Sequence, residues 1–147
     1  VRLEALSRWF GVGMTADLVA GVWLGFHNEP DHMAPIDGAV PYDVFVERLD
    51  PAVVRLQLDL GNMVMGGGDP LRYLTRHADR YWSFHVKDVV RDRSRDTALG
   101  SGIVDLVAIL KAIPALDRKW CVVEQEGASG TVDAARADWR WLSRLEF

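Results

Sequence analysis

The chain has 147 residues, of which 49% are hydrophobic and 26% charged, and this is the composition of one ordinary globular domain. Its net charge of −4 argues against a surface that binds the nucleic-acid backbone, because such surfaces usually carry a basic face. The single cysteine, Cys121, excludes both an internal disulfide framework and a zinc site built from several cysteines.

The hydrophobic pattern predicts strands and helices in alternation. In chain order they are helix 2–19, strand 22–27, helix 41–49, strand 53–60, helix 69–78, strand 81–86, helix 103–113, strand 120–124 and helix 132–142. One helix is thus followed by four βα units, and such alternation is typical of a parallel sheet with right-handed crossovers. No linker divides this pattern, so we expect a single domain over residues 1–147 of the α/β class.

Four βα units form either a small open sheet or half of an eight-stranded (β/α)8 barrel, the TIM barrel. The second strand decides between them, since Arg55, Gln57 and Asp59 share one of its faces and apolar residues the other. A similar alternation sets Ser83, His85 and Lys87 against Trp82, Phe84 and Val86. A central strand of an open, doubly wound sheet would be apolar on both faces, so the pattern favours half a barrel with a polar interior.

The polar residues of this chain gather where the predicted strands end. These ends carry His27-Asn28-Glu29 with Asp31 and His32 just after, then Asp59, then His85-Val86-Lys87-Asp88, then Glu124-Gln125-Glu126. In barrels the active groups gather at the carboxyl ends of the strands. Histidine and carboxylate side chains together suit one divalent ion such as Mn²⁺, Mg²⁺, Co²⁺ or Zn²⁺.

Several short motifs carry a resemblance to a known family. They are His27-Asn28, Leu58-Asp59-Leu60-Gly61-Asn62, Gly67-Gly68-Asp69-Pro70, His85-Val86-Lys87-Asp88, Leu99-Gly100-Ser101-Gly102 and Val123-Glu124-Gln125. In this order and spacing, the chain resembles the sugar phosphate isomerases/epimerases with the xylose-isomerase-like TIM barrel. The resemblance runs from about residue 10 to about residue 145. It corresponds to the C-terminal half of the barrel, which contains strands five to eight.

The resemblance implies one divalent metal held by a Glu, an Asp, a His and a second Glu. The last three correspond to Asp59, His85 and Glu124. The position of the first Glu holds His32, so His32 takes its place as a ligand or Glu29 reaches in instead.

The chemistry expected of such a site is proton transfer next to a carbonyl through a metal-bound enediolate. Glu124 would move the proton and Lys87 would stabilise negative charge on oxygen. The resemblance adds His27 and Arg91 as substrate contacts, and Asn62 is placed to bind a sugar hydroxyl. The leading prediction is a sugar, sugar phosphate or cyclitol isomerase or epimerase. The alternatives are a keto-sugar or inosose dehydratase and an inactive half-barrel that binds a ligand.

Base-excision endonucleases are a second class of enzyme that shares the barrel. They need more histidines than the four present and a basic surface, so the composition argues against this class. An inactive half-barrel would be indicated by Asp59, His85 and Glu124 lying more than about 6 Å apart, too far for one ion.

Half a barrel leaves its first and fourth strands as free edges. We therefore expect as partners a carbohydrate substrate and either a missing N-terminal half-barrel or a second copy. No apolar run is long enough to cross a membrane. The chain opens at Val1 within a helical pattern, so we expect upstream sequence to be missing with any targeting signal, and a cytoplasmic location.

Overall fold

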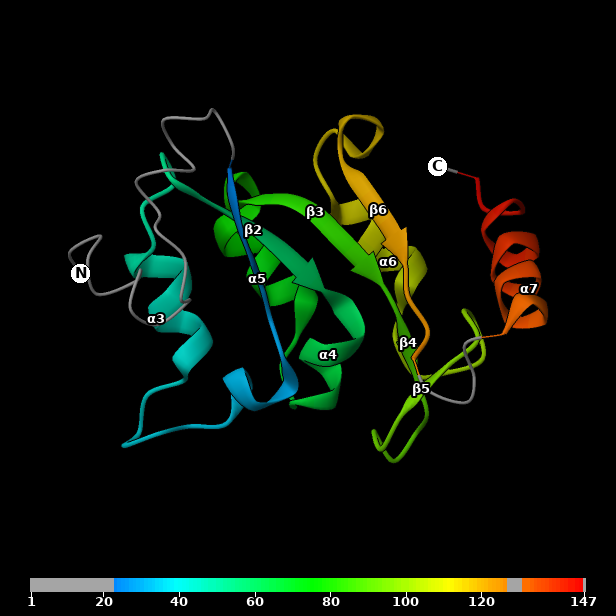
Figure 1. Cartoon of the computed structure of the whole chain (residues 1–147), viewed down its shortest axis with the longest axis horizontal. Coiled ribbons are helices and arrows are strands. Elements are labelled where there is room, and N and C mark those ends of the chain that lie inside the picture. The colour runs from blue at the N-terminus through cyan, green and yellow to red at the C-terminus, as the bar shows by residue number, and fades with distance from the viewer. Residues whose placement is uncertain (1–22, 127–130, 147) are drawn as a thin grey trace.

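The computed structural model describes residues 23–126 and 131–146, and its centre is a sheet of parallel strands (Figure 1). The sheet has the order β1 (Leu24–His27), β2 (Val54–Asp59), β3 (Tyr81–Val86) and β6 (Trp120–Val123). This order follows the chain, as in a barrel, and the prediction of a partial α/β barrel is confirmed. The helix expected over 2–19 lies outside the described residues.

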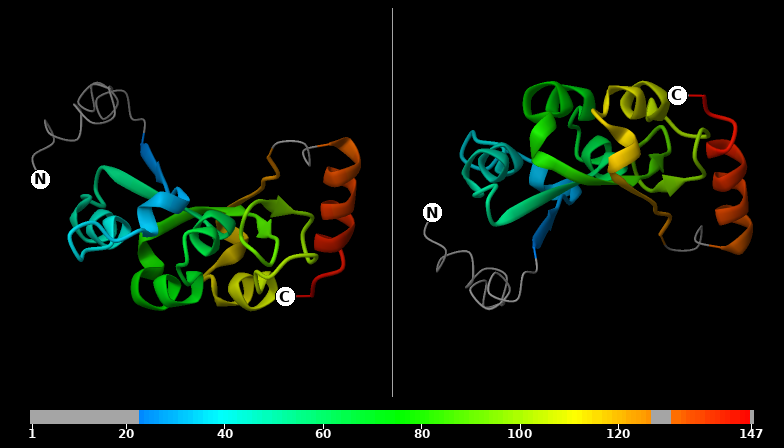
Figure 2. Two further views of the ribbon diagram at one scale, coloured as in Figure 1. Left: turned by 90° about the horizontal axis from the view of Figure 1, so that it is seen from below. Right: turned by 90° about the horizontal axis from the view of Figure 1, so that it is seen from above.

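The helices pack around this sheet. They are α3 (Pro41–Arg48), α4 (Leu60–Met65), α5 (Pro70–His77), α6 (Leu106–Ala112) and α7 (Val132–Leu142), with 3-10 turns at Pro30–Met33, Ala78–Arg80 and Leu116–Arg118. Figure 2 shows α5 and α6 side by side on one face of the sheet, with α3 and α7 towards its two ends. None of the helices in the part of the chain that the structure describes is long and apolar enough to span a membrane.

The core lies between the sheet and its helices. On β2 the side chains of Val54, Leu56 and Leu58 are buried, whereas Arg55 and Gln57 are only partly covered. The predicted alternation of a helix-facing apolar face and a polar inner face is therefore confirmed for this strand.

Trp82 departs from that alternation. We expected it on the apolar face of β3, but 43% of it is exposed and its ring lies 5.0 Å from the Arg55 guanidinium carbon. The cause is an irregularity in the pairing, since Leu56 pairs with Tyr81 and the next residue, Gln57, pairs with Ser83. Such a bulge turns one extra residue to the other face of a strand.

The helix α4 and the hairpin after β3 were not predicted from the sequence. The six-residue helix α4 follows β2 directly, and the Asp59 carboxylate caps it by accepting a hydrogen bond from the Asn62 amide. A short antiparallel hairpin of β4 (Asp88–Val89) and β5 (Asp96–Thr97) follows β3. The Asp88 carboxylate organises the loop beyond this hairpin, because it accepts hydrogen bonds from the backbone amides of Gly100, Gly102 and Val104.

Candidate metal centre at the strand ends

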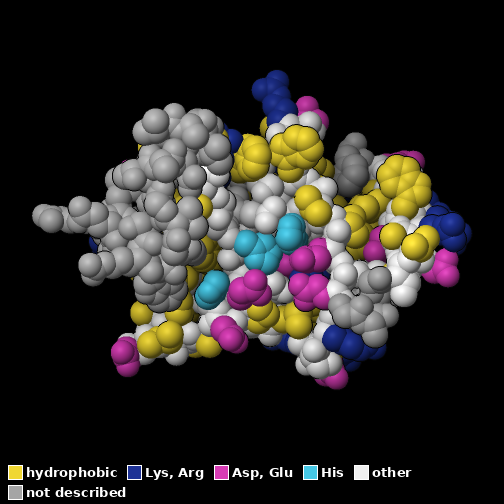
Figure 3. All heavy atoms as spheres, viewed as in Figure 1, with side chains coloured by type: hydrophobic (Ala, Val, Ile, Leu, Met, Phe, Trp, Pro, Cys, Tyr) yellow, Lys and Arg dark blue, Asp and Glu magenta, His cyan; other side chains and the backbone are white. Residues whose placement is uncertain are grey.

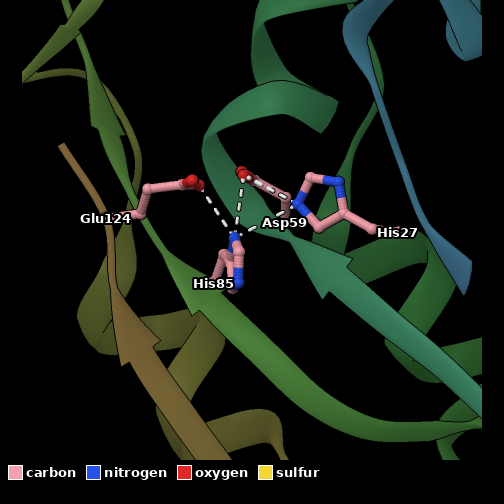
Figure 4. A group of neighbouring side chains, drawn as sticks. All are labelled: His27, Asp59, His85 and Glu124. Carbon is pink, nitrogen blue, oxygen red and sulfur yellow. Dashed lines mark hydrogen bonds and ion pairs between the residues drawn. The ribbon is translucent and has the colours of Figure 1, made fainter. Parts of the chain in front are cut away.

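The carboxyl ends of the four strands bring one titratable side chain each to a common point (Figure 4). His27 ends β1, Asp59 ends β2, His85 is the penultimate residue of β3, and Glu124 directly follows β6. One nitrogen or carboxylate oxygen from each lies within 4.8 Å of all the others. The separation that would indicate an inactive half-barrel is therefore not observed for Asp59, His85 and Glu124.

The individual distances describe a tight group. His85 Nδ1 lies 2.8 Å from Glu124 Oε2 and 3.6 Å from Asp59 Oδ2. His27 Nε2 lies 3.3 Å from Asp59 Oδ2 and 3.2 Å from His85 Nδ1. Each of these two ring nitrogens also has a carboxylate oxygen within 3.3 Å, from Asp59 for His27 and from Glu124 for His85.

Asp59 is the most firmly held member of this group. Asn28, which is fully buried, accepts a hydrogen bond from the Asp59 amide at 2.8 Å and donates one to its carbonyl at 3.0 Å. The end of β1 is thereby tied to the end of β2. This role of Asn28 was not predicted. The only sign of it in the sequence is the position of a polar residue directly after the strand-end His27.

The two oxygens of the Asp59 carboxylate have different surroundings. Oδ1 caps α4 by accepting a hydrogen bond from the backbone amide of Asn62 at 2.7 Å. Oδ2 is buried and makes no hydrogen bond of good geometry with the described residues, although three side-chain nitrogens lie 3.2 to 3.6 Å from it. A buried carboxylate oxygen that faces two imidazoles in this way fits a divalent cation, since buried polar atoms are normally satisfied.

The charges of the group are strongly coupled. Burial by itself would raise the pKa of Asp59, but the contacts with His27, His85, the Asn62 amide and Lys87 outweigh it and hold that pKa well below its usual range. Asp59 in turn is the main cause of a raised pKa at His85, where Glu124 adds to the effect and burial opposes it. The Asp59 carboxylate is therefore available as an anionic ligand at neutral pH.

Lys87 lies beside the group and is buried, with 1% of its side chain exposed. Its ammonium has four oxygen neighbours, namely Glu124 Oε2 at 2.9 Å, Asn62 Oδ1 at 3.1 Å, Asp59 Oδ2 at 3.2 Å and Glu126 Oε1 at 3.5 Å. Burial works to lower the pKa of Lys87, but the combined attraction of Glu124 and Asp59 raises it. The lysine is therefore a permanent cation within the candidate site.

His32 and Glu29 do not join the group of four. The His32 ring stacks on Phe26 with ring centroids 5.5 Å apart, and its Nδ1 accepts a hydrogen bond from the Glu29 amide at 3.0 Å. It thus closes the capping box of the 3-10 turn Pro30–Met33. Glu29 instead lies beside the group, with Oε1 3.4 Å from His27 Nδ1 and Oε2 accepting from Asn62 Nδ2 at 3.2 Å.

The fourth member of the observed group is His27, which the sequence suggested as a substrate contact, and not His32 or Glu29, which it suggested as ligands. The physical reason lies in the turn after β1, which uses the His32 ring for capping and packing. Of the other predicted substrate contacts, Asn62 is buried next to Lys87, whereas Arg91 is exposed beyond β4 and forms no ion pair with the described residues.

Figure 3 shows that histidine and carboxylate side chains gather near the middle of the face turned to the viewer, which is the side of the sheet that α5 and α6 leave open. The architecture and this cluster together define a partial parallel α/β barrel with a polar centre at the carboxyl ends of its strands. The chain belongs to the family described as xylose isomerase-like TIM barrel, whose model matches residues 16–145.

The curated relatives include inosose dehydratases. One from Geobacillus kaustophilus is 32% identical over 109 residues, which cover 62% of this chain and 35% of the relative. One from Geobacillus thermodenitrificans is 30% identical over 137 residues, which cover 79% of this chain and 45% of the relative. The rhizopine catabolism protein MocC of Rhizobium meliloti is 35% identical over 127 residues, which cover 72% and 37%. The chain thus spans less than half the length of these relatives.

Solved structures agree with this assignment. A sugar phosphate isomerase/epimerase from Parabacteroides distasonis superposes with a TM-score of 0.67 at 25% identity, covering 82% of this chain and 45% of that one. A second one from the same organism superposes with a TM-score of 0.73 at 22% identity, covering 90% and 50%. The second likeness concerns the fold alone, and both place this chain on about half of a longer protein.

Proposed function

We propose that this chain carries the metal-binding half of the active site of a carbohydrate isomerase or epimerase. The observation that supports this is the convergence of His27, Asp59, His85 and Glu124 from four successive strand ends within 4.8 Å. Two imidazoles and two carboxylates would hold one divalent ion of the Mn²⁺, Mg²⁺, Co²⁺ or Zn²⁺ type. When bound, such an ion would polarise a substrate carbonyl and its neighbouring hydroxyl, which acidifies the hydrogen on the carbon between them.

Glu124 is the residue that would move this proton. It lies at the open edge of the group with 28% of its side chain exposed, whereas Asp59 is fully buried and is engaged in capping α4. A base must reach the carbon from which it takes a proton, so the partly exposed carboxylate suits the role. Lys87 and Asn62, which are hydrogen-bonded to each other at 3.1 Å, would orient Glu124 and the oxygens of the substrate.

Exchange of substrate hydrogen for deuterium tests this role without requiring a full turnover. In D₂O with Mn²⁺, a keto-inositol and a ketohexose are offered separately and followed by proton NMR. We expect the hydrogen next to the carbonyl of one of them to exchange, and Glu124→Gln to reduce the rate by about 100-fold or more.

The matched control is Glu47→Gln, which removes a carboxylate on the exposed side of α3. It should exchange like the parent chain. Full exchange by the Glu124→Gln variant would refute the proposed role of Glu124.

Dehydration of a keto-cyclitol is a second candidate, and two observations favour it. The relatives named above include inosose dehydratases, and a chain related to them can share their reaction. In addition, the group of four holds one partly exposed carboxylate, whereas epimerisation by two bases needs a second on the opposite face of the substrate. Loss of water from the keto-inositol, seen by mass spectrometry, would select dehydration over epimerisation.

The free edges of the sheet are where we expect a partner chain to bind. Strands β1 and β6 each pair on one side only within the described residues, and all four residues of β6 are exposed. A groove beside β6 is lined by Val123, Ala135, Trp139 and Leu142 and runs along α7. An N-terminal half-barrel or a second copy of the chain would cover these edges and complete the substrate pocket.

A further inference from the structure

The buried ammonium of Lys87 shares its oxygen partners with the candidate metal centre. Asp59 Oδ2 lies 3.2 Å from Lys87 Nζ and also 3.3 Å from His27 Nε2. Glu124 Oε2 lies 2.9 Å from Lys87 Nζ and also 2.8 Å from His85 Nδ1. The two oxygens that a divalent ion would use are therefore already paired with a cation that belongs to the protein.

The chain is built to keep the ammonium at this point. Gly61 makes room for the lysine stem, because a Cβ there would lie 2.5 Å from Lys87 Cγ and 2.8 Å from its Cβ and Cδ. Asn62, in the same turn of α4, accepts a hydrogen bond from the ammonium at 3.1 Å. With 1% of its side chain exposed, Lys87 cannot swing into solvent without opening this packing.

We infer that the Lys87 ammonium competes with the divalent ion for the carboxylates of Asp59 and Glu124. Without the ion, Lys87 holds the two carboxylates together, and its positive charge weakens the binding of the ion. This inference rests on the metal centre of the proposed function. The buried carboxylate of Asp59 and the partly exposed one of Glu124 repel each other when no counterion is present, so a fixed ammonium between them stabilises the ion-free group. The same positive charge repels a divalent ion beside it, and burial leaves this repulsion largely unscreened by salt.

Mn²⁺ binding measured by isothermal titration calorimetry tests the inference directly. Lys87→Met and Lys87→Gln remove the charge and keep a side chain of similar length. We expect both to bind Mn²⁺ roughly tenfold more tightly than the parent chain. The matched control is Lys111→Met, which removes a positive charge from an exposed position on α6 and should leave the affinity unchanged.

Thermal unfolding with and without Mn²⁺ provides a readout that covers poorly folded variants. Without the ion, both Lys87 variants should unfold at a lower temperature than the parent chain, and saturating Mn²⁺ should raise their midpoint by more than it raises the parent's. Equal or weaker binding by both variants, or failure of Mn²⁺ to restore their fold, would overturn the inference while the metal centre stands. If the parent chain binds no Mn²⁺, the metal centre itself fails and the inference with it.

Discussion

The open face of the sheet has two contrasting ends. At the carboxyl ends of the strands, His27, Asp59, His85 and Glu124 form a tight charged group beside a buried lysine. At the amino ends, the Arg55 guanidinium carbon lies 3.9 Å above the Trp23 ring and 5.0 Å from that of Trp82. Trp120, the first residue of β6, belongs to this second end and is 66% exposed.

Side chains two or four residues apart on a strand share a face, so each strand can contribute residues to both ends of the open face of the sheet. Arg55 and Asp59 of β2 show this directly, since one meets tryptophans and the other meets histidines. In barrels the carboxyl ends carry the chemistry and the opposite ends carry stability. The contrast therefore predicts that substitutions at the two ends affect different measurements.

The largest effect is expected at the carboxyl end, from Asp59→Asn. Asparagine also caps helices, so α4 should form and the fold should be kept. The charge that attracts a divalent ion is lost, and we expect Mn²⁺ affinity to fall by about 100-fold or more in calorimetric titration. Unchanged affinity would show that the ion, if bound at all, binds elsewhere.

A smaller effect is expected at the amino end, where Arg55→Met should lower the stability of the fold and leave metal binding unchanged. The contacts of the guanidinium with the two tryptophans would be lost, and a cation–π contact contributes about 0.5–2 kcal/mol. We expect the free energy of unfolding in urea to fall by about 1 kcal/mol, with Mn²⁺ affinity unchanged. A loss of affinity as large as that of Asp59→Asn would remove the functional distinction between the two ends.

The smallest effect concerns His32, which lies near the carboxyl end but takes a structural role. Burial is the main cause that lowers the pKa of His32 below 6.5, against the attraction of Glu29 and Asp31. The unfolded chain then binds a proton more tightly than the folded chain. Stability contributed by neutral His32 is present above about pH 6.5 and declines as the pH falls through that value toward the lower pKa of the folded state.

Replacement of His32 by Gln, which also completes capping boxes, isolates this contribution. In urea denaturation between about pH 7.5 and about pH 5.5, the variant should lose slightly less stability than the parent chain. The difference is expected to be small, because water screens the part of the ring that is exposed. A variant with a steeper loss than the parent would contradict the structural role of His32.

The alternation of strands and helices and the partial-barrel fold could both be predicted from the amino-acid sequence, because both depend on local periodicity. A residue two positions from another on a strand shares its face, so Arg55, Gln57 and Asp59 could be placed on the inner side without a structure. The positions of Asp59, His85 and Glu124 at the ends of predicted strands likewise place them together, since parallel strands in a barrel end at one rim. The predicted ligand roles of these residues still await the metal-binding measurements.

Contacts between distant segments select the residue at the end of β1 that joins Asp59, His85 and Glu124. His27, Glu29 and His32 lie within six positions of one another, and local pattern does not separate them. The packing of His32 on Phe26 and the capping of the 3-10 turn remove it from the centre and leave His27 there. In the same way, the bulge that exposes Trp82 and the position of Lys87 between two carboxylates depend on contacts between strands, which periodicity along one chain segment does not encode.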